Sequence, residues 1–598
     1  GHQPMHSACG RYVMVYNGEI YNYLEIRKEL QDSGITEGWH GNSDTEVMLA
    51  AISQWGLEKA ITRFTGMFAF ALWDKKYRNL KLARDRLGEK PLYYGWVNKT
   101  FLFGSELKAL RKYPGWQGEI DRNTLALFLR YNCIPAPYSI YKNIFKILPG
   151  TFVSVKQEDI TKETTSPLDP NHYWSAQVIA EAGINEPLDN TEEETINQLD
   201  AHLRNSIKGQ MIADVPLGAF LSGGVDSSTI VALMQAQSTQ PVKTFTIGFE
   251  EEAYNEAHDA KAVAKHLGTD HTELYVTPQE AMSIIPNLPS LYDEPFSDSS
   301  QIPTYLISKL ARQHVTVSLS GDGGDELFGG YNRYFWGERI WNKINRCPGS
   351  LRHILNWGIK TLSPMTWDSV FQFLDPLFPE NIKQRNPGDK LHKLAGILTS
   401  KNPQEMYLRL ASHWGSSESI VPGSKEIPTL PTNPKKWANI QNFTPAMMYL
   451  DMVCYLPDDI LVKVDRASMG VSLETRVPFL DHRVVEFAWK VPMHMKIRNN
   501  QGKWLLRQVL YKYVPKELIE RPKMGFAVPI DSWLRGPLRD WAEDLLSADK
   551  LKNEGFFKPD PIRKIWQTHL SGKANYQHHL WDILMFQAWL RDQKTIPQ

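Results

Sequence analysis

Short apolar runs alternate with amphipathic stretches through the middle of the chain. Apolar residues at three- and four-residue spacing predict helices at Glu193–Met211, Ser227–Gln235, Glu256–Leu267 and Pro303–Arg312. Compact apolar runs between them predict strands at Pro216–Leu221, Val242–Phe249, His271–Val276 and Val315–Ser320. Strands that alternate with helices are typical of a doubly wound, mostly parallel sheet, which binds ligands beyond the carboxyl ends of its strands.

The beginning of the chain has a different pattern, with many short strands and few helices. Strands are predicted at Tyr12–Tyr16, Met67–Trp73, Leu80–Arg84, Leu92–Val97 and Phe101–Gly104, and helices at Tyr23–Asp32 and Glu46–Trp55. This pattern fits a layered α+β domain. Residues 119–194 are polar and rich in proline, and the chain after residue 331 is helical and rich in tryptophan. We therefore expect domains at 1–118 and 195–598, joined by a connecting segment at 119–194.

Composition excludes several classes of partner. The chain has 67 basic and 67 acidic residues, and a net charge of zero gives no reason to expect nucleic acid or an anionic membrane. No apolar run approaches the roughly 18 residues that a bilayer span needs. The four cysteines are scattered without a Cys-x-x-Cys pair, which indicates a reducing, cytoplasmic setting rather than structural zinc or disulfides.

A glycine-rich turn follows the first predicted strand of the middle region. Its sequence is Ser222-Gly223-Gly224-Val225-Asp226-Ser227-Ser228. Backbone N–H groups in such a turn can approach an anion closely, and the dipole of the following helix adds partial positive charge. The common P-loop ends in Gly-Lys-Ser/Thr, and this turn lacks that ending. An ordinary strand–helix turn rich in small residues is the alternative interpretation.

A second glycine- and acid-rich loop follows the strand at Val315–Ser320. It reads Gly321-Asp322-Gly323-Gly324-Asp325-Glu326, so both loops are expected at the same edge of one sheet. Carboxylates beside phosphates indicate bound Mg²⁺ with oxygen ligands, and Asp226 and Asp325 are the candidate ligands. A solvated acidic turn is the alternative.

Two clusters in the first domain carry possible chemistry. Asn17-Gly18-Glu19 lies between strand-like stretches, and Asn-Gly there is also a common turn. Ser43-Asp44-Thr45-Glu46 precedes an apolar helix, and it could simply cap that helix.

The glycine-rich turn resembles the pyrophosphate loop of ATP pyrophosphatases, and the combined motifs resemble the glutamine-dependent asparagine synthetase family. Arg476-Val477-Pro478-Phe479-Leu480-Asp481 adds to this resemblance, which covers nearly the whole chain. The implied fold is α/β: a truncated N-terminal-nucleophile α+β sandwich, then a doubly wound parallel-sheet ATP-pyrophosphatase domain with a helical C-terminal part.

The resemblance implies ATP-dependent amidation of a carboxylate, with aspartate the usual substrate. The carboxylate attacks ATP-Mg²⁺, an acyl-adenylate forms as pyrophosphate leaves, and ammonia then displaces AMP. The ATP and pyrophosphate site would comprise Leu221, Ser222, Gly223, Gly224, Asp226, Ser227, Ile247, Ser320 and Gly321. Lys503 would stabilise charge near the α-phosphate, and Asp322 would act as base on the attacking ammonium. A homodimer is the oligomer we expect.

For the glutaminase half, the resemblance implies that Asn17 and Gly18 form an oxyanion hole and that Glu19 and Asp44 bind glutamine. The family nucleophile is an N-terminal cysteine whose own α-amine acts as base. The printed chain opens Gly1-His2, so we expect it to depend on external ammonia. Cys9 is expected to be a buried structural cysteine.

One departure from the family pattern bears on the substrate. Asparagine synthetases commonly have Gly-Glu-Gly where this chain has Gly321-Asp322-Gly323. The shorter carboxylate keeps open a sister amidotransferase that acts on another acid, such as a sugar acid of a surface polysaccharide. A β-lactam synthetase-like enzyme and a catalytically silent scaffold are further alternatives. His482 and Glu486 have helical i,i+4 spacing, but without a third ligand a surface role is favoured over metal binding.

Overall fold

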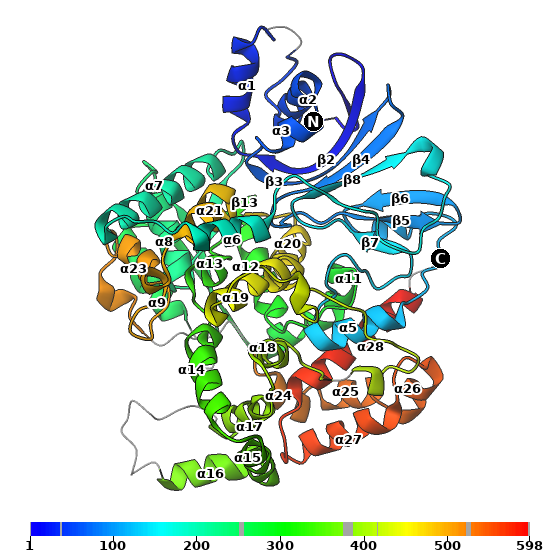
Figure 1. Cartoon of the computed structure of the whole chain (residues 1–598), viewed down its shortest axis with the longest axis vertical. Helices are drawn as coiled ribbons and strands as arrows, with labels where there is room; N and C mark the ends of the chain where they lie inside the picture. The colour runs from blue at the N-terminus through cyan, green and yellow to red at the C-terminus, as the bar shows by residue number, and fades with distance from the viewer. Residues whose placement is uncertain are drawn as a thin grey trace.

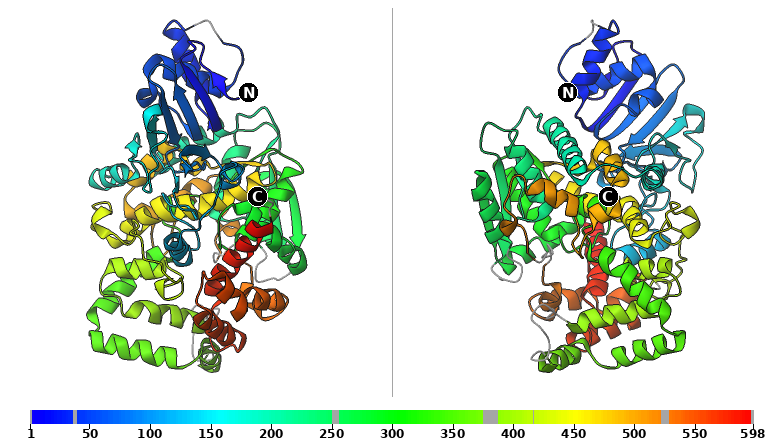
Figure 2. Two further views of the ribbon diagram at one scale, coloured as in Figure 1. Left: turned by 90° about the vertical axis from the view of Figure 1, so that its right-hand side faces the viewer. Right: turned by 60° about the vertical axis from the view of Figure 1, so that its left-hand side comes forward.

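The computed structural model describes residues 2–35, 39–249, 256–374, 387–415, 417–521 and 528–595. A domain of two stacked sheets lies at one end of the molecule, and helices that follow residue 331 extend to the opposite end (Figure 1). Figure 2 shows the same order of parts from two other sides. Among the described residues, no helix combines the length and the apolar character of a membrane span.

The first domain contains a six-stranded and a three-stranded antiparallel sheet. The larger sheet has the order β1-β2-β3-β4-β8-β9, and its strands are Met5–His6, Tyr12–Ile20, Gly66–Asp74, Asn79–Arg84, Thr151–Lys156 and Asn171–His172. The smaller sheet has the order β6-β5-β7, with strands Thr100–Gly104, Tyr93–Val97 and Ile144–Lys146. Strands β7, β8 and β9 come from residues 119–194, the segment that we expect to connect the domains.

The central strand β3 shows how the layers are held together. Phe68, Phe70 and Leu72 belong to the core under helices α1 (Tyr23–Asp32), α2 (Asp44–Trp55) and α3 (Leu57–Ile61). The alternate residues Ala69 and Ala71 belong to the core shared with the small sheet. Because side chains alternate across a strand, one apolar run serves both layers.

The alternative interpretation of Asn17-Gly18 as a turn is wrong, because both residues lie inside β2. Gly18 pairs with Phe68 of β3 in an unbroken antiparallel ladder. Its φ of +149° and the clash that a Cβ would make with the Met67 carbonyl oxygen explain why glycine stands in the middle of a strand.

The second domain is built on a five-stranded parallel sheet with the order β12-β11-β10-β13-β14. The strands are Asp270–Val276, Lys243–Phe249, Leu217–Phe220, Val317–Leu319 and Glu474–Arg476. The strand order reverses between β10 and β13, so the crevice beyond their carboxyl ends is the expected ligand position for this class of sheet.

Helices cover both faces of this sheet, as a doubly wound fold requires. On one face, apolar residues of α7 (Glu192–Gln210), α8 (Val225–Gln235) and α9 (Ala257–Leu267) join one core. On the other face, α12 (Gln301–Arg312) packs in the core that contains Phe245 and Ile247 of β11. The α/β fold class and the alternating pattern predicted for this region are confirmed.

The remaining helices are short or belong to the last third of the chain. The shorter ones are α4 (Leu107–Leu110), α5 (Arg122–Tyr131), α6 (Ala176–Asn185), α10 (Pro278–Met282), α11 (Leu288–Tyr292) and α13 (Gly324–Phe328). The later ones begin with α14 (Asn332–Arg346), α15 (Gly349–Thr361), α16 (Pro364–Leu374), α17 (Pro387–Leu398), α18 (Pro403–Leu410), α19 (Phe443–Leu450), the π-helix η8 (Asp451–Ile460) and α20 (Leu461–Met469). They continue with α21 (His482–Lys490), α22 (Met493–Lys496), α23 (Trp504–Leu510), α24 (Ile530–Arg535), α25 (Arg539–Leu545), α26 (Ala548–Glu554), α27 (Pro559–Leu570) and α28 (Gln577–Thr595).

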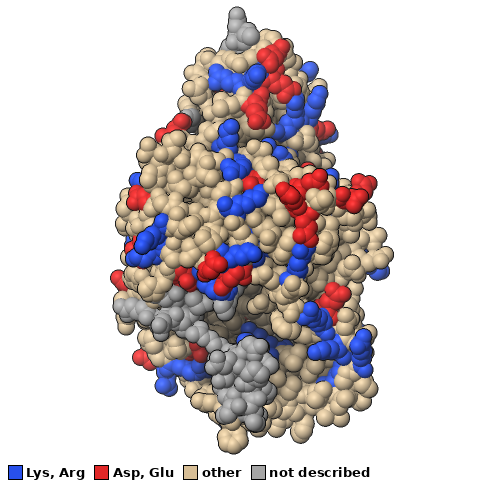
Figure 3. Space-filling view, turned by 90° about the vertical axis from the view of Figure 1, so that its left-hand side faces the viewer, with Lys and Arg blue, Asp and Glu red and all other residues tan. Residues whose placement is uncertain are grey.

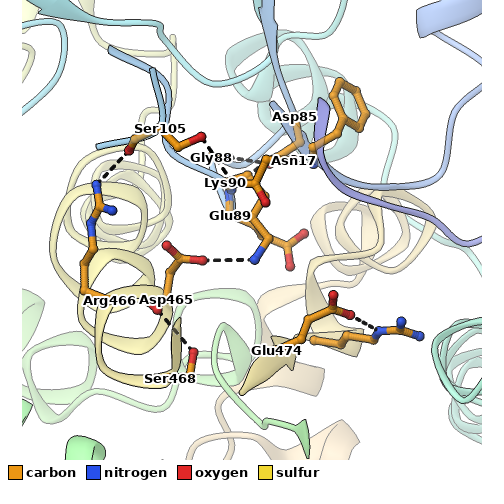
Figure 4. A network of polar contacts seen from close by, with 12 residues as sticks. Asn17, Asp85, Gly88, Glu89, Lys90, Ser105, Asp465, Arg466, Ser468 and Glu474 are labelled. Atoms are coloured by element: carbon orange, nitrogen blue, oxygen red, sulfur yellow. Dashed lines mark hydrogen bonds and ion pairs between the residues drawn. The ribbon is translucent and has the colours of Figure 1, made fainter. Parts of the chain in front are cut away.

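Helix α20 holds the two domains together. Lys90, which follows β4, donates to Asp465 Oδ1 at 3.0 Å, and both side chains are largely buried. Arg466 binds Glu106 at 2.8 Å and the Ser105 carbonyl oxygen at 3.0 Å (Figure 4). Removing one partner of a buried charge pair strongly destabilises a protein, because the other charge is left unpaired. These contacts therefore fix how the two domains meet.

Charges of both signs are interspersed on the face of the molecule drawn in Figure 3. Most of that surface is uncharged, and small basic and acidic groups lie beside one another. This distribution agrees with the zero net charge of the chain.

Asp85 organises the loop that carries Lys90, and its loss should destabilise the fold. The carboxylate accepts N–H groups of Leu87, Gly88, Glu89 and Lys90 at 3.2, 2.7, 2.9 and 2.9 Å. In Asp85→Ala these buried donors lose their acceptor, which should lower the free energy of unfolding by about 2–4 kcal/mol. Urea denaturation measures the change. Exposed Asp32→Ala is the control and should change stability little; equal effects of both variants would contradict the prediction.

Candidate functional site

The loop after β10 forms a glycine-rich cradle, residues 222–228, at the start of α8. Ser222 Oγ lies 3.0 Å from Ser227 Oγ and accepts the Gly224 N–H at 3.3 Å. Gly223 has a φ of +71°, which favours glycine at this position. The loop therefore turns back on the first turn of α8 and places backbone donors beside a helix N-terminus, where phosphates bind.

The loop after β13 packs directly against this cradle. A Cβ on Gly321 would lie 2.9 Å from both the Asp226 carbonyl carbon and the Ser227 nitrogen. A Cβ on Gly324 would clash with Asp226 Oδ1. The glycines of the second loop thus allow it to approach the first, and both lie at the switch point of the sheet.

Lys503 joins the two loops through an ammonium shared by two carboxylates. Its Nζ donates to Asp226 Oδ2 and lies 2.6 Å from Asp325 Oδ1. Lys503 is only 5% exposed, and although burial lowers its pKa, Asp226 and Asp325 raise it above the ordinary lysine value. Lys503 therefore stays protonated, and its two carboxylate partners hold its ammonium between the loops.

The backbone of Lys503 is also constrained. Its φ of +59° is uncommon for a residue other than glycine, and its N–H donates to the Phe328 carbonyl oxygen at 3.0 Å. Backbone strain of this kind persists where the surrounding structure fixes it, and it clusters at active sites.

Asp322 is held within its own loop and is influenced by a second lysine. Its Oδ2 accepts a hydrogen bond from Ser320 Oγ, and burial raises its pKa while the charge of Lys463 lowers it. Lys463 Nζ in turn donates to Asp298 at 3.0 Å. Neither Lys463 nor Asp298 was among the residues predicted from the sequence, although a lysine after the pair Asp458-Asp459 was a possible signal.

The remaining nucleotide candidates lie at the same edge of the sheet. Leu221 and Ile247 are buried next to the ends of β10 and β11, and the Ser320 N–H donates to the Arg476 carbonyl oxygen at 2.9 Å. Because β10, β11 and β13 are neighbours in one sheet, these candidates come from adjacent strands and the loops that follow them.

A second group of candidates lies in β2 and at the start of α2. Asp44 Oδ2 accepts the Tyr16 hydroxyl at 2.8 Å and the Ile20 N–H at 3.0 Å, and Oδ1 accepts the Thr45 N–H at 2.7 Å. Ser43 caps α2, as the alternative interpretation predicted. Asn17 Nδ2 lies 3.4 Å from Ser105 Oγ. The strand and the helix thus bring the candidate glutamine-binding residues together.

Glu19 connects this group to the second domain. Its carboxylate lies 3.6 Å from Arg476 of β14, and burial followed by the charge of Asp44 raises its pKa to about 7. Arg476 also binds Glu474 at 2.7 Å and donates to the carbonyl oxygens of Gln210 and Ile212.

The expectation for Cys9 has a clear outcome. Cys9 is exposed, with its sulfur 3.3 Å from Ser7 Oγ, so the expected burial is wrong; the turn that carries it lies outside the core. His482 begins α21, and Glu486 accepts from Trp174 Nε1 at 3.0 Å. No group of three metal-ligating side chains occurs in the part of the chain that the structure describes.

Two known families each match one part of the chain. The family described as "Asparagine synthase" matches residues 198–591, and the one described as "Glutamine amidotransferase domain" matches residues 1–168. Fold and site thus define a glutamine amidotransferase domain joined to an ATP-dependent synthetase. The chain belongs to the asparagine synthase family.

Similar proteins come from bacteria and archaea. "Asparagine synthetase [glutamine-hydrolyzing] 1" of Bacillus subtilis (strain 168) is 32% identical over 592 residues, covering 98% of this chain and 87% of that protein. A "Putative asparagine synthetase [glutamine-hydrolyzing]" of Mycobacterium tuberculosis (strain ATCC 25618 / H37Rv) is 33% identical, with coverages of 98% and 86%. One from Methanocaldococcus jannaschii is 34% identical, with coverages of 78% and 83%.

Gly330→Ala should disrupt the contact between Lys503 and its carboxylates. A Cβ at Gly330 would clash with Asp325 Oδ1 and Lys503 Cε. We expect kcat/KM for ATP to fall about a hundredfold, because small displacements of catalytic groups have effects of this size. The control is Gly358→Ala in α15, where a Cβ meets nothing within 4 Å. Equal activity of both variants in steady-state assays would contradict the prediction.

Glu19 should make the stability of the protein depend on pH. Its folded pKa of about 7 lies above the ordinary value of 4.5, so the folded state binds this proton more tightly than the unfolded state. The free energy of unfolding should therefore fall as the pH rises from about 4.5 to about 7. Glu19→Gln should reduce that fall in urea denaturation at several pH values, and exposed Glu193→Gln should not. Identical pH profiles of wild type and Glu19→Gln would disprove this assignment.

Proposed function

We propose that this protein amidates a carboxylate through an acyl-adenylate formed from ATP. The observation that carries the proposal is the Lys503 ammonium held between Asp226 and Asp325, at the switch point of the sheet. A cation, two carboxylates and a glycine-rich cradle lie together there, and these are the groups that bind phosphates and stabilise the charge that develops during phosphate chemistry.

ATP is proposed to lie across the two loops. The cradle formed by residues 222–228 takes the β- and γ-phosphates on its backbone N–H groups and the N-terminus of α8. The adenosine lies against Leu221, Ile247, Ser320 and Gly321, which the fold gathers at the same edge. Lys503 is then placed to stabilise negative charge at the α-phosphate.

The two carboxylates on Lys503 fit a role as Mg²⁺ ligands. Mg²⁺ is commonly bound through one or two carboxylates together with substrate phosphates. Asp226 and Asp325 supply such a pair on the two phosphate-binding loops, and they would hold the ion. When bound, Mg²⁺ neutralises charge on the leaving pyrophosphate.

In the first step, an oxygen of the acceptor carboxylate attacks the α-phosphorus, and the bond from that phosphorus to pyrophosphate breaks. In the second, ammonia attacks the acyl carbon, the attacking nitrogen loses a proton, and AMP leaves. Asp322 is the proposed acceptor of that proton, since burial raises its pKa toward the range that suits a general base.

In an enzyme with the N-terminal nucleophile in place, the first domain is proposed to supply the ammonia from glutamine; added ammonia would serve without it. Asn17 and the Gly18 N–H would form the oxyanion hole, and Glu19 and Asp44 would bind the substrate. Their convergence at the end of β2, and the Glu19–Arg476 contact with the second domain, support this role.

Aspartate is the acceptor that the names of the relatives suggest. The shorter Asp322 in place of the common glutamate supports a second candidate, another carboxylic acid. The four free cysteines support a cytoplasmic location.

ATP–pyrophosphate exchange tests the proposal directly. The protein is incubated with ATP, Mg²⁺, labelled pyrophosphate and a panel of carboxylic acids, and ammonium or glutamine is then added. We expect acid-dependent exchange, followed by AMP and the amide when nitrogen is supplied. Absence of exchange with every acid would overturn the proposed function.

Asp322→Asn should separate the two steps of the reaction. The amide keeps the shape of the side chain but cannot accept the proton, so amide formation should fall by about 10²–10⁴ while acid-dependent exchange remains. Asp322→Glu, which introduces the glutamate common in the family, should stay within about tenfold of wild type. Loss of exchange and amidation in equal measure would show that Asp322 acts in adenylation instead.

A further inference from the structure

Helix α15 turns its apolar side chains toward solvent. Leu351, Ile354 and Leu355 are 44%, 62% and 44% exposed, and Trp357 is 71% exposed. No residue of α15 is buried. A surface helix of a globular protein normally packs its apolar side against the core and leaves its polar side in water, so this arrangement is the reverse of the usual one.

The four exposed apolar residues form one continuous face, here called the apolar strip. They recur at three- or four-residue intervals, which places them next to one another along the helix. The opposite side of α15 faces the protein, because Arg352 donates to the Ser400 carbonyl oxygen at 2.9 Å and both Asn356 and Ile359 are half-buried. The apolar strip is therefore the outer surface of the helix.

The position of α15 leaves this strip accessible to a large flat partner. Figure 1 places α15 and α16 at the end of the molecule opposite the first domain, and the green helices lie at that same end in both views of Figure 2. A contiguous apolar patch on the surface of a soluble protein is a mark of a protein or membrane interaction site.

The exposed charges around the strip are mostly basic. Helix α14 leads into α15 and carries basic residues at three- and four-residue spacing, and α17 packs against α15. Among the described residues between 332 and 401, Glu338 is the one exposed acidic side chain, and the exposed lysines and arginines are Arg339, Lys343, Arg346, Lys360, Lys390, Lys393 and Lys401. The zero net charge of the whole chain averages over this local excess.

An apolar helix face bordered by lysine and arginine is typical of helices that lie in the surface of an anionic bilayer. Tryptophan favours the boundary between lipid headgroups and acyl chains, and Trp357 lies between His353 and Lys360 at helical spacing. A second copy of the chain fits this surface less well. In a two-fold dimer the same patch meets itself, so two sets of basic side chains would be brought together.

We propose that the apolar strip of α15 and the basic residues around it form a docking surface for an anionic lipid bilayer. The strip enters the boundary between headgroups and acyl chains, and the lysines and arginines contact lipid phosphates. The protein thus lies on the membrane without spanning it. Because the cytoplasmic leaflet carries anionic lipids, this contact is compatible with the proposed cytoplasmic location. The inference does not depend on the proposed amidation.

Co-sedimentation of the full chain with lipid vesicles tests the proposal. One set of vesicles is phosphatidylcholine alone, and the other contains equal parts of phosphatidylcholine and phosphatidylglycerol. We expect binding to the anionic vesicles at about 0.1 M salt, at least about tenfold weaker binding to the neutral ones, and release from the anionic ones at about 1 M salt. Absence of binding to the anionic vesicles, or equal binding to both kinds, would overturn the proposal.

Two double variants locate the contact. Ile354→Ser with Trp357→Ser removes the centre of the apolar strip and should weaken binding to the anionic vesicles at least about tenfold. Lys343→Gln with Arg346→Gln should weaken it by a similar factor, because each basic residue near the surface contributes to the attraction. Val178→Ser is the matched control: this apolar side chain is 60% exposed on α6, and the variant should bind as wild type.

Two further measurements separate lipid binding from misfolding and from self-association. All four substituted residues are exposed, so the urea midpoints of both double variants should match that of wild type. Sedimentation equilibrium without lipid should give the same mass for wild type and for Ile354→Ser with Trp357→Ser. A dimer that only the wild type forms would assign the strip to a second copy and overturn the proposal. Equal vesicle binding by wild type and this variant would overturn it as well.

Discussion

The synthetase site depends on one buried cation placed between two carboxylates. Asp226 and Asp325 come from different loops of the sheet, and without Lys503 between them their charges would repel. A buried lysine is costly unless it is paired, so each partner is needed by the others. Gly324 and Gly330 make this possible, because a Cβ at either position would enter the space of the three charged side chains. The close approach of the two loops and the balance of their charges around Lys503 therefore depend on each other.

Charge pairs also join the two domains. Lys90 and Asp465, and Arg466 and Glu106, are charge pairs that cross from the first domain to α20. Helix α20 continues directly from the π-helix η8 and also carries Lys463. One continuous segment therefore contacts the first domain and also carries the lysine whose charge acts on Asp322.

The loop that follows β13 carries two acidic residues with different lysine neighbours. Asp325 contacts Lys503, whose ammonium also binds Asp226 of the cradle at residues 222–228. Asp322 is instead influenced by the charge of Lys463, which binds Asp298. In the proposed reaction, Asp325 would act beside the phosphates and Asp322 on the attacking nitrogen.

The sequence alone predicted strands β10 to β13 and the two loops of the synthetase site. Helix α1 has the predicted bounds, Tyr23–Asp32, because its apolar spacing is a local property. The glycine-rich cradle could likewise be predicted, since the strand, turn and helix adjoin in the chain. Only the tertiary structure showed that Asn17 and Gly18 lie within a strand, that Cys9 is exposed, and that Lys463 joins Asp298. A large cavity lined by the π-helix η8 is likewise built from segments hundreds of residues apart. Local patterns encode backbone conformation and burial, whereas distances between remote side chains are set by how the layers pack.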